Sequence, residues 1–223
     1  MTPGEFIAFD GPDGCGKSTQ AALLAEALGA VLTREPGGTA IGTILRSILL
    51  DTANTNLCSQ AEMLLMQADR AQHIEEVVRP HVEAGRTVVS DRSIVSTLAY
   101  QGFGRGHSIS DLLALGTQAS GGLLPTIAIV LSTPVHLRAE RLAAKDPDRF
   151  ESAGAAFQHR VADGFDHLTQ RQLPFPVVVV DGTGNPLQIH VRVQEALARH
   201  RVRIQRRRRR RPTTRTPKET TQP

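Results

Sequence analysis

The sequence predicts an α/β protein in which a five-stranded parallel sheet is covered by helices on both faces. Two patterns predict this fold class. Five short runs of apolar and β-branched residues are spaced along the chain, and longer stretches with helical periodicity separate them. A third observation is the glycine-rich stretch GPDGCGKST, which lies between the first run and the first helical stretch.

The five apolar runs are the expected strands, because β-branched residues favour extended backbone and each run is too short for a helix. In chain order they are EFIAFD at 5–10, AVLTRE at 30–35, RTVVSDR at 86–92, TIAIVLS at 126–132 and FPVVVVDG at 175–182. Helices are expected at 17–28, 39–50, 59–83, 93–101, 109–121, 134–144, 154–172 and 186–200. The order of strands and helices alternates, which favours parallel pairing of the strands.

The length of 223 residues suits a single domain, which we place at 1–200. The formal net charge of +4 averages two unlike regions: 201–223 hold ten Lys and Arg against one Glu, so they carry +9 and the body carries −5. The run RRRRRRPTTRTPKETTQP has no apolar residues with which to form a core. We expect 201–223 to be a disordered tail, either dispensable or in non-specific contact with polyanions.

The compartment is predicted from what the chain lacks. The N-terminus, MTPGEF, has no basic stretch before its short apolar run, and no apolar stretch approaches the roughly 20 residues that a membrane helix needs. The two cysteines, Cys15 and Cys58, are too few for a metal site or a disulfide framework. We expect a soluble cytoplasmic protein.

The stretch Gly11-x-x-x-x-Gly16-Lys17-Ser18 fits a phosphate-binding loop, and it stands between a strand and a helix as that loop requires. Glycines let backbone N–H groups wrap a phosphate, and the helix N-terminus points at the anion. We expect Lys17 to bridge the β- and γ-phosphates of a nucleotide and Ser18 to bind Mg²⁺. The expected nucleotide site is Gly11, Pro12, Asp13, Gly14, Cys15, Gly16, Lys17, Ser18 and Thr19.

Two further segments carry charged residues suited to phosphate chemistry. RTVVSDR places Asp91 at the end of a buried strand, where it can hold Mg²⁺ through water, and Arg92 beside it as a phosphate clamp. A structural ion pair is the alternative for these two residues. DPDRFE places Asp148 and Arg149 between two helices, as in a lid that closes over the transferring phosphate, although solvated loop charges are as common.

Together these motifs make the chain resemble the bacterial thymidylate kinases. The resemblance rests on GPDGCGKST, TREPGGT at 33–39, LLMQADRAQHIE at 64–75, DRSIVSTLAYQGFGRG at 91–106 and DRFE at 148–151, in family order over roughly 5–200. It implies a three-layer P-loop kinase fold with a mobile lid at about 142–153. It also implies transfer of the γ-phosphoryl group of ATP to dTMP with Mg²⁺ as cofactor, and a homodimer.

The resemblance also implies roles for individual residues. Lys17, Arg92, Arg149 and Asp13 would be catalytic, with Arg149 reaching the transferring phosphoryl group from the lid. Ser18 and Asp91 would hold the metal. Tyr100 would crowd the sugar 2′ position, and Arg70 would bind the thymine carbonyl. The expected dTMP site is Asp13, Arg34, Met66, Arg70, Arg92, Thr97, Tyr100 and Gln101.

The sequence departs from the family pattern at four positions. Met66 replaces an aromatic residue that stacks on thymine, Ser93 replaces an aromatic residue or histidine, and Thr126 and Ser132 replace aspartates. Two alternatives therefore stay open. One is a kinase for another pyrimidine monophosphate, and the other is a catalytically weak nucleotide-binding protein that acts through its basic tail.

Overall fold

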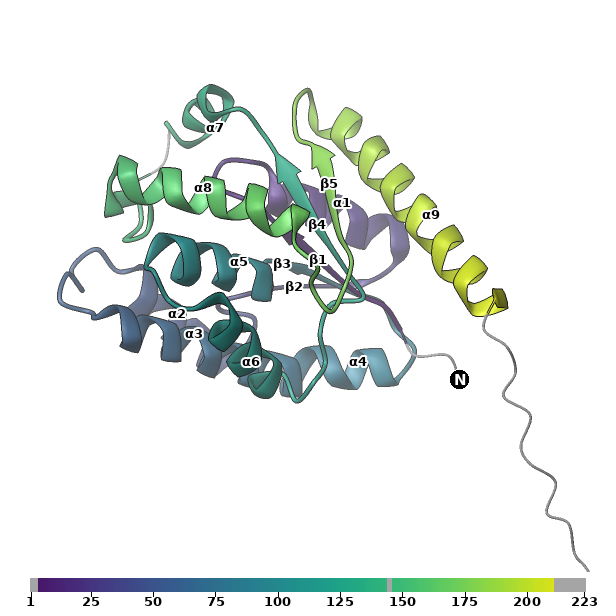
Figure 1. The fold of residues 1–223 in the computed structure, drawn as a ribbon, viewed down its shortest axis with the longest axis horizontal. Coiled ribbons are helices and arrows are strands. Elements are labelled where there is room, and N and C mark those ends of the chain that lie inside the picture. The colour runs from purple at the N-terminus through teal and green to yellow at the C-terminus, as the bar shows by residue number, and fades with distance from the viewer. Residues whose placement is uncertain (1–3, 144–145, 211–223) are drawn as a thin grey trace, which may run out of the picture.

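The computed structural model describes residues 4–143 and 146–210, with side chains described as far as 201 (Figure 1). Five strands form one sheet in the order β2-β3-β1-β4-β5, and all neighbours are parallel. The strands are β1 (Phe6–Asp10), β2 (Val31–Arg34), β3 (Val88–Asp91), β4 (Ile127–Ser132) and β5 (Val177–Asp181). The predicted five-stranded parallel sheet is confirmed.

The helices follow the predicted order with shifted ends. The first group is α1 (Lys17–Leu28), α2 (Ala40–Leu50), α3 (Ser59–His73), the π-helical η1 (Ile74–Val78) and α4 (Arg79–Glu83). The second group is α5 (Ile94–Thr97), the π-helical η2 (Leu98–Gly104), α6 (Ile109–Ala119), α7 (Val135–Leu142), the 3₁₀ turn η3 (Glu151–Ala153), α8 (Ala155–Gln170) and α9 (Pro186–Arg210). The predicted helix at 93–101 is longer than expected, because η2 continues it to Gly104.

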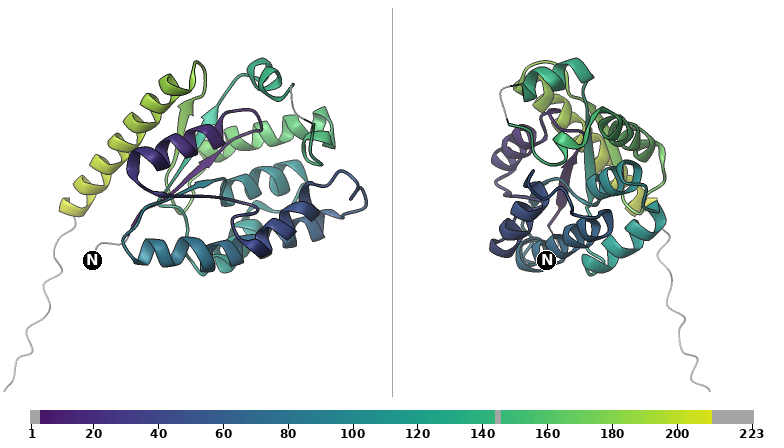
Figure 2. Two further views of the ribbon diagram at one scale, coloured as in Figure 1. Left: turned by 180° about the vertical axis from the view of Figure 1, so that it is seen from behind. Right: turned by 90° about the vertical axis from the view of Figure 1, so that its left-hand side faces the viewer.

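Helices cover both faces of the sheet (Figure 2). On one face, α1 packs on β1 and β3 and α9 packs on β5, through an apolar cluster that includes Phe9, Leu24 and Val193. On the other face, α5, η2 and α8 bury a larger cluster that includes Leu98 and Phe165. Alternate residues of β4 join the two clusters, which is the pattern of a strand buried on both faces.

Strand register decides which loops meet at the carboxyl edge of the sheet. Phe9 of β1 pairs with Asp91 of β3, and β2 ends beside the same residue because Arg34 pairs with Asp91. The loops that follow these three strands therefore lie side by side. They contain GPDGCGKST, TREPGGT and the DR dipeptide, which are far apart in the sequence.

The C-terminal helix corrects the predicted boundary at residue 200. α9 continues to Arg210, so 201–210 are helical rather than disordered. Arginine is a good helix former, and Arg201 forms an ion pair with Glu5 at 2.5 Å that holds this part of the helix to the start of β1. The rest of the predicted tail, 211–223, lies outside the described residues. No helix of the described chain is long and apolar enough to cross a membrane.

Candidate active site

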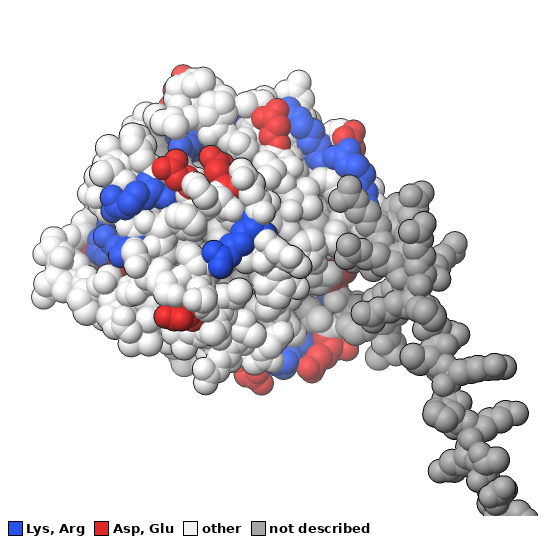
Figure 3. Space-filling view, in the orientation of Figure 1, with Lys and Arg blue, Asp and Glu red and all other residues white. Residues whose placement is uncertain are grey.

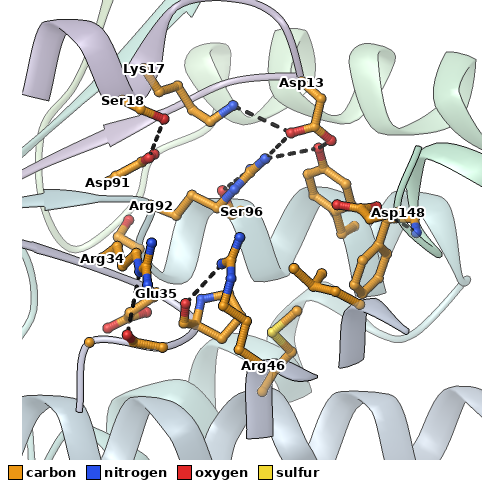
Figure 4. Close-up of a pocket in the computed structure, with 18 of the residues that line it drawn as sticks. Asp13, Lys17, Ser18, Arg34, Glu35, Arg46, Asp91, Arg92, Ser96 and Asp148 are labelled. Carbon is orange, nitrogen blue, oxygen red and sulfur yellow. Dashed lines mark hydrogen bonds and ion pairs between the residues drawn. The ribbon is translucent and has the colours of Figure 1, made fainter. Parts of the chain in front are cut away.

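A pocket of about 820 Å³ opens at the carboxyl edge of the sheet, beside the N-terminus of α1 (Figure 4). Most of the residues predicted from the sequence line it. These are Asp13, Gly14, Gly16, Lys17, Ser18, Thr19, Arg34, Met66, Arg70, Asp91, Arg92, Thr97, Tyr100 and Gln101. Gly11, Pro12, Cys15 and Arg149 are outside this lining.

The glycine-rich loop needs glycine at the positions where its backbone turns. Gly14 has a φ of 77°, and a Cβ there would lie 2.6 Å from the backbone oxygen of Arg138. Gly16, with φ 98°, is the N-cap of α1. The Lys17 ammonium donates to the Pro12 carbonyl at 3.0 Å and lies 3.6 Å from an Asp13 oxygen. The loop therefore places a buried cation in front of a helix N-terminus, which is a site for phosphate.

Ser18 and Asp91 meet at the edge of this loop. The Ser18 hydroxyl donates to Asp91 Oδ2 at 2.5 Å, and Figure 4 shows the two side chains facing each other. Asp91 Oδ1 is buried without a hydrogen-bond partner among the described residues. Hydroxyl and carboxylate oxygens are hard ligands of the kind that Mg²⁺ prefers, and an unpartnered buried oxygen is available to a metal-bound water. This donor set fits Mg²⁺.

Arg92 crosses the pocket from the end of β3. Its backbone φ of 80° is unusual for a residue with a side chain, and it turns the guanidinium toward the glycine-rich loop. The guanidinium pairs with Asp13 Oδ1 and donates to Ser96 Oγ at 3.0 Å, while the Tyr100 hydroxyl donates to Asp13 Oδ2 at 2.6 Å. Burial alone would lower the pKa of Arg92, but the facing oxygens of Tyr100, Asp13 and Asp91 raise it well above its usual range. Arg92 therefore keeps its charge.

A buried acid that sequence reasoning missed fixes this turn. Asp10 accepts hydrogen bonds from the backbone N–H and the hydroxyl of both Ser93 and Ser96, at 2.6–3.1 Å. Burial raises the pKa of Asp10, and the two serine hydroxyls, the charge of Arg92 and the Ser93 N–H oppose that shift. Asp10 thereby caps α5 and holds Ser96 against Arg92. Ser93, one of the departures from the family pattern, is explained by this contact.

Two more arginines face the same space from below Arg92 (Figure 4). Arg34 Nε donates to the Gly37 carbonyl at 3.4 Å, and Arg46 Nη1 donates to the Pro36 carbonyl at 2.9 Å. Burial and the neighbouring guanidinium groups of Arg34 and Arg92 lower the pKa of Arg46. Sequence reasoning missed Arg46, although it is the one charged residue of the apolar helix AIGTILRSILL. Three converging guanidinium groups favour a bound anion.

Arg70 is held rigidly on the α3 side of the pocket. Its Nε and Nη2 donate to Glu35 Oε2 at 3.1 and 2.9 Å, Nη2 also donates to Thr97 Oγ1 at 2.9 Å, and Nη1 donates to Gln67 Oε1. Burial would raise the pKa of Glu35, but Arg70 and His73 lower it. Glu35 was missed in the sequence. In TREPGGT only Arg34 was predicted to contact the pocket. The partner of Glu35, Arg70, lies 35 residues further along the chain.

The structure does not bring Arg149 to the pocket. Its Nη1 lies 2.8 Å from Glu62 Oε2 and its Nε donates to the Leu49 carbonyl at 2.7 Å, so the guanidinium is buried beside the end of α2. The arginine that reaches the glycine-rich loop is Arg141 of α7. Its Nη1 donates to the carbonyls of Gly14 and Cys15, both at 3.3 Å. Sequence reasoning missed Arg141, because the motif DRFE pointed to Arg149 instead.

A family model and individual relatives all match the chain to one family. Residues 9–193 match the family model for thymidylate kinase. The thymidylate kinase of Geobacter sp. (strain M21) is 41% identical over 208 residues, which cover 88% of this chain and 92% of that protein. The thymidylate kinase of Desulfovibrio desulfuricans is 40% identical over 205 residues, covering 86% and 94%.

A solved structure shares the fold. The crystal structure of thymidylate kinase from Ehrlichia chaffeensis superimposes with a TM-score of 0.72 at 30% sequence identity. The match covers 87% of this chain and all of that chain.

Proposed function

The chain belongs to the thymidylate kinase family, and we propose that the pocket at the carboxyl edge of its sheet is the site where it phosphorylates dTMP. The reaction transfers the γ-phosphoryl group of ATP to dTMP and gives dTDP and ADP, for dTTP synthesis. The family match does not favour the two alternatives, a kinase for another pyrimidine monophosphate and a weak nucleotide-binding protein. The observation that carries the proposed site is the convergence of Lys17, Arg92 and Arg46 on one pocket beside the glycine-rich loop.

ATP binds on the glycine-rich loop side in this proposal. The backbone of 11–19 wraps the phosphates, and Lys17 offers its ammonium to the β- and γ-phosphates from a buried position. Arg141 adds a second cation, since its guanidinium already lies against Gly14 and Cys15. Arg141 thus takes the role that the sequence had suggested for Arg149.

Magnesium fits beside this loop, on the Ser18 hydroxyl and, through water, on Asp91. When bound, Mg²⁺ neutralises charge on the phosphate oxygens. The described residues hold no cluster of three His, Cys, Asp or Glu side chains with metal-site geometry. A nucleotide-bound Mg²⁺ takes most of its ligands from phosphate and water, so two protein oxygens suffice. The role of Ser18 and Asp91 here is to position the metal against the loop.

dTMP binds on the opposite side, with its phosphate among Arg92, Arg34 and Arg46. Arg92 Nη2 and the Asp13 carboxylate lie at the boundary between the two substrates. Tyr100, hydrogen-bonded to Asp13, lies on the sugar side in this proposal, where it would crowd a 2′-hydroxyl. Arg70, Thr97, Gln101 and Met66 surround the remaining space, where the base is placed.

The chemistry needs cations rather than a general base. An oxygen of the dTMP phosphate is already ionised at neutral pH and attacks the γ-phosphorus in line, while the bond to the β-phosphate oxygen breaks and ADP leaves. Repulsion between two anionic substrates opposes their approach. Lys17, Arg92 and Arg141 offset that repulsion and stabilise the charge on the transferring group, since they are fixed in place before the substrates bind.

We also propose a homodimer, a cytoplasmic location and a non-specific polyanion contact. An apolar face made by Ile41, Ile44 and Ile48 of α2 and Leu64 of α3 is 38–62% exposed in the single chain. Large exposed apolar faces are typical of interfaces. Ile44→Glu should lower the mass measured by analytical ultracentrifugation, and an unchanged mass would place the interface elsewhere.

The proposed cytoplasmic location would give the enzyme access to its substrate ATP. On the face drawn in Figure 3, acidic and basic side chains are interspersed, and we assign polyanion contact to the arginine-rich segment because of its run of arginines.

The site assignment is tested by ADP formation with ATP and dTMP, dUMP, dCMP or dGMP as acceptor. dTMP should give the highest kcat/KM, and a higher value with dCMP or dGMP would overturn the assignment of the base site. Arg46→Gln should raise the KM for dTMP at least about tenfold, because it removes one charged partner of the phosphate. The KM for ATP should stay unchanged in that variant. An equal rise in the KM for ATP and in the KM for dTMP would contradict the assignment of separate ATP and dTMP sides to the pocket.

A further inference from the structure

Glu62 of α3 is fully buried; it accepts hydrogen bonds from Gln101 and Arg105 and forms an ion pair with Arg149. Gln101 Nε2 donates to Glu62 Oε1 at 3.0 Å, Arg105 donates to both oxygens at 2.9–3.2 Å, and Arg149 Nη1 lies 2.8 Å from Oε2. Of these, only Gln101 lines the pocket. Glu62 therefore touches the pocket only through Gln101.

The contact with Glu62 decides which way the Gln101 amide faces. A carboxylate paired with two guanidinium groups can only accept, so the amide must present its N–H₂ to Glu62 and its oxygen to the other side. A reversed amide would bring two oxygens to about 3 Å in a buried place. In the observed orientation, Gln101 Oε1 is buried without a partner among the described residues. A buried acceptor without a protein partner that borders a ligand pocket can be satisfied by a donor on the ligand.

Pyrimidine bases differ in the group that they offer to such an acceptor. Thymine carries an N–H at ring position 3, whereas cytosine carries an unprotonated acceptor nitrogen there. A site that presents an acceptor to this position rejects the base that lacks the donor, because both groups stay unpaired. The orientation of a single amide can thus distinguish the two bases.

We propose that Glu62 is a positioning residue that fixes the Gln101 amide with its oxygen toward the base and thereby favours thymine over cytosine. The inference rests on the proposed function, in which Gln101 meets the base edge. Arg105 donates to both oxygens of the Glu62 carboxylate and Arg149 pairs with Oε2, so these arginines keep the carboxylate from rotating to release the amide. In this arrangement the buried guanidinium of Arg149 stabilises the Glu62 carboxylate and does not bind phosphate.

The test is the ratio of kcat/KM for dTMP to kcat/KM for dCMP in Glu62→Gln. The new amide can donate as well as accept, so Gln101 is free to turn over and offer N–H₂ to cytosine. We expect the ratio to fall roughly tenfold, the change expected for one buried hydrogen bond. The KM for dTMP should rise while kcat changes little, because the transferring phosphate is not touched.

Arg105→Gln is the matched control, because it removes one partner of Glu62 and leaves the Gln101 contact intact. It should lower the melting temperature and leave the dTMP to dCMP ratio unchanged. A purely structural role for Glu62 predicts a lower melting temperature and an unchanged ratio in both variants, and that result would overturn the proposal. Glu62→Asp, whose side chain is one methylene too short to reach Gln101 at the observed 3.0 Å, should shift the ratio in the same direction if Glu62→Gln does not fold.

Gln101→Leu separates this inference from the site assignment on which it rests. A normal KM for dTMP in Gln101→Leu would show that Gln101 does not meet the base, and the proposed base site would fail. A raised KM in Gln101→Leu with an unchanged ratio in both Glu62→Gln and Glu62→Asp would reject the role of Glu62 alone.

Discussion

The Arg92 guanidinium pairs with the Asp13 carboxylate although 79 residues separate them in the sequence. In the proposed function, Asp13 belongs to the loop that binds ATP and Arg92 belongs to the side that receives dTMP. The ion pair would then join the two halves of the pocket and fix the guanidinium where the phosphates of the two substrates meet.

The first prediction concerns the two cations nearest to this boundary. Lys17→Ala and Arg92→Ala should each lower kcat/KM with ATP and dTMP by about 10²–10³, the usual loss for one preorganised electrostatic partner. Their melting temperatures should change far less. Steady-state ADP formation and thermal denaturation check both statements. Arg199→Ala, which removes an exposed arginine paired only with Glu195, should leave turnover unchanged.

The second prediction contrasts two arginines of the lid region. Arg141→Gln should lower turnover about tenfold or more at an unchanged melting temperature, since its guanidinium lies on the phosphate loop. Arg149→Gln should instead lower the melting temperature, because breaking a buried ion pair costs about 3–5 kcal/mol of stability. Below its melting temperature it should turn over dTMP nearly normally. Lost turnover with unchanged stability in Arg149→Gln would restore the lid role that the sequence suggested.

Local patterns were enough to predict the sheet, the position of the glycine-rich loop between β1 and α1, and the position of Asp91 at the end of β3, since each is encoded by neighbouring residues. The contacts that local patterns could not predict join residues that are far apart in the sequence. Asp10 caps a helix 83 residues further on, and Glu62 meets arginines from two other segments. Which arginine of the lid region reaches the loop depends on how α7 packs, and no local pattern distinguishes Arg141 from Arg149.

The third prediction is a pH dependence at Asp69. Burial and the nearby Glu35 raise the pKa of Asp69 to about 6 from 3.8. A raised carboxyl pKa means that the folded state binds the proton more tightly, so wild-type stability falls as pH rises from about 4 to above 6. The loss is up to about 3 kcal/mol for a shift of about two pH units. Asp69→Asn, which can still accept from the Gly37 N–H, has no such loss.

The melting temperature of Asp69→Asn should therefore rise relative to wild type between pH 4 and pH 7, by roughly 5–10 °C for a chain of this size. Thermal denaturation of both proteins at half-unit pH steps measures it. A difference that stays constant over this range would show that Asp69 does not titrate there.

The fourth prediction concerns the arginine-rich C-terminal segment. A chain that ends after Arg201 keeps the ion pair with Glu5, so its kinase activity and melting temperature should match those of the full chain. Its retention on heparin should fall sharply, because consecutive arginines bind polyanions through counterion release and need no fold. Elution across a salt gradient measures the change. Lost activity in the shortened chain would show that the removed residues contact the body.

The last prediction concerns Met66, which lines the base side of the pocket one helical turn before Arg70. An aromatic side chain stacked on a base contributes about 1–3 kcal/mol in single-stranded nucleic-acid sites, whereas a sulfur–aromatic contact contributes roughly 0.3–1.5 kcal/mol. Methionine should therefore hold thymine more loosely than an aromatic ring. Its flexible side chain should also tolerate other substituents at the 5-position of the base.

Met66→Phe should lower the KM for dTMP severalfold and narrow the tolerance for other pyrimidine monophosphates, because a rigid ring admits one base plane. Steady-state kinetics with dTMP, dUMP and a bulkier 5-substituted analogue measure both effects. The KM for ATP serves as the internal control, since Met66 lies on the dTMP side of the pocket. Unchanged constants for all three acceptors would mean that Met66 only packs against the apolar core next to α3 and that the base rests on other residues.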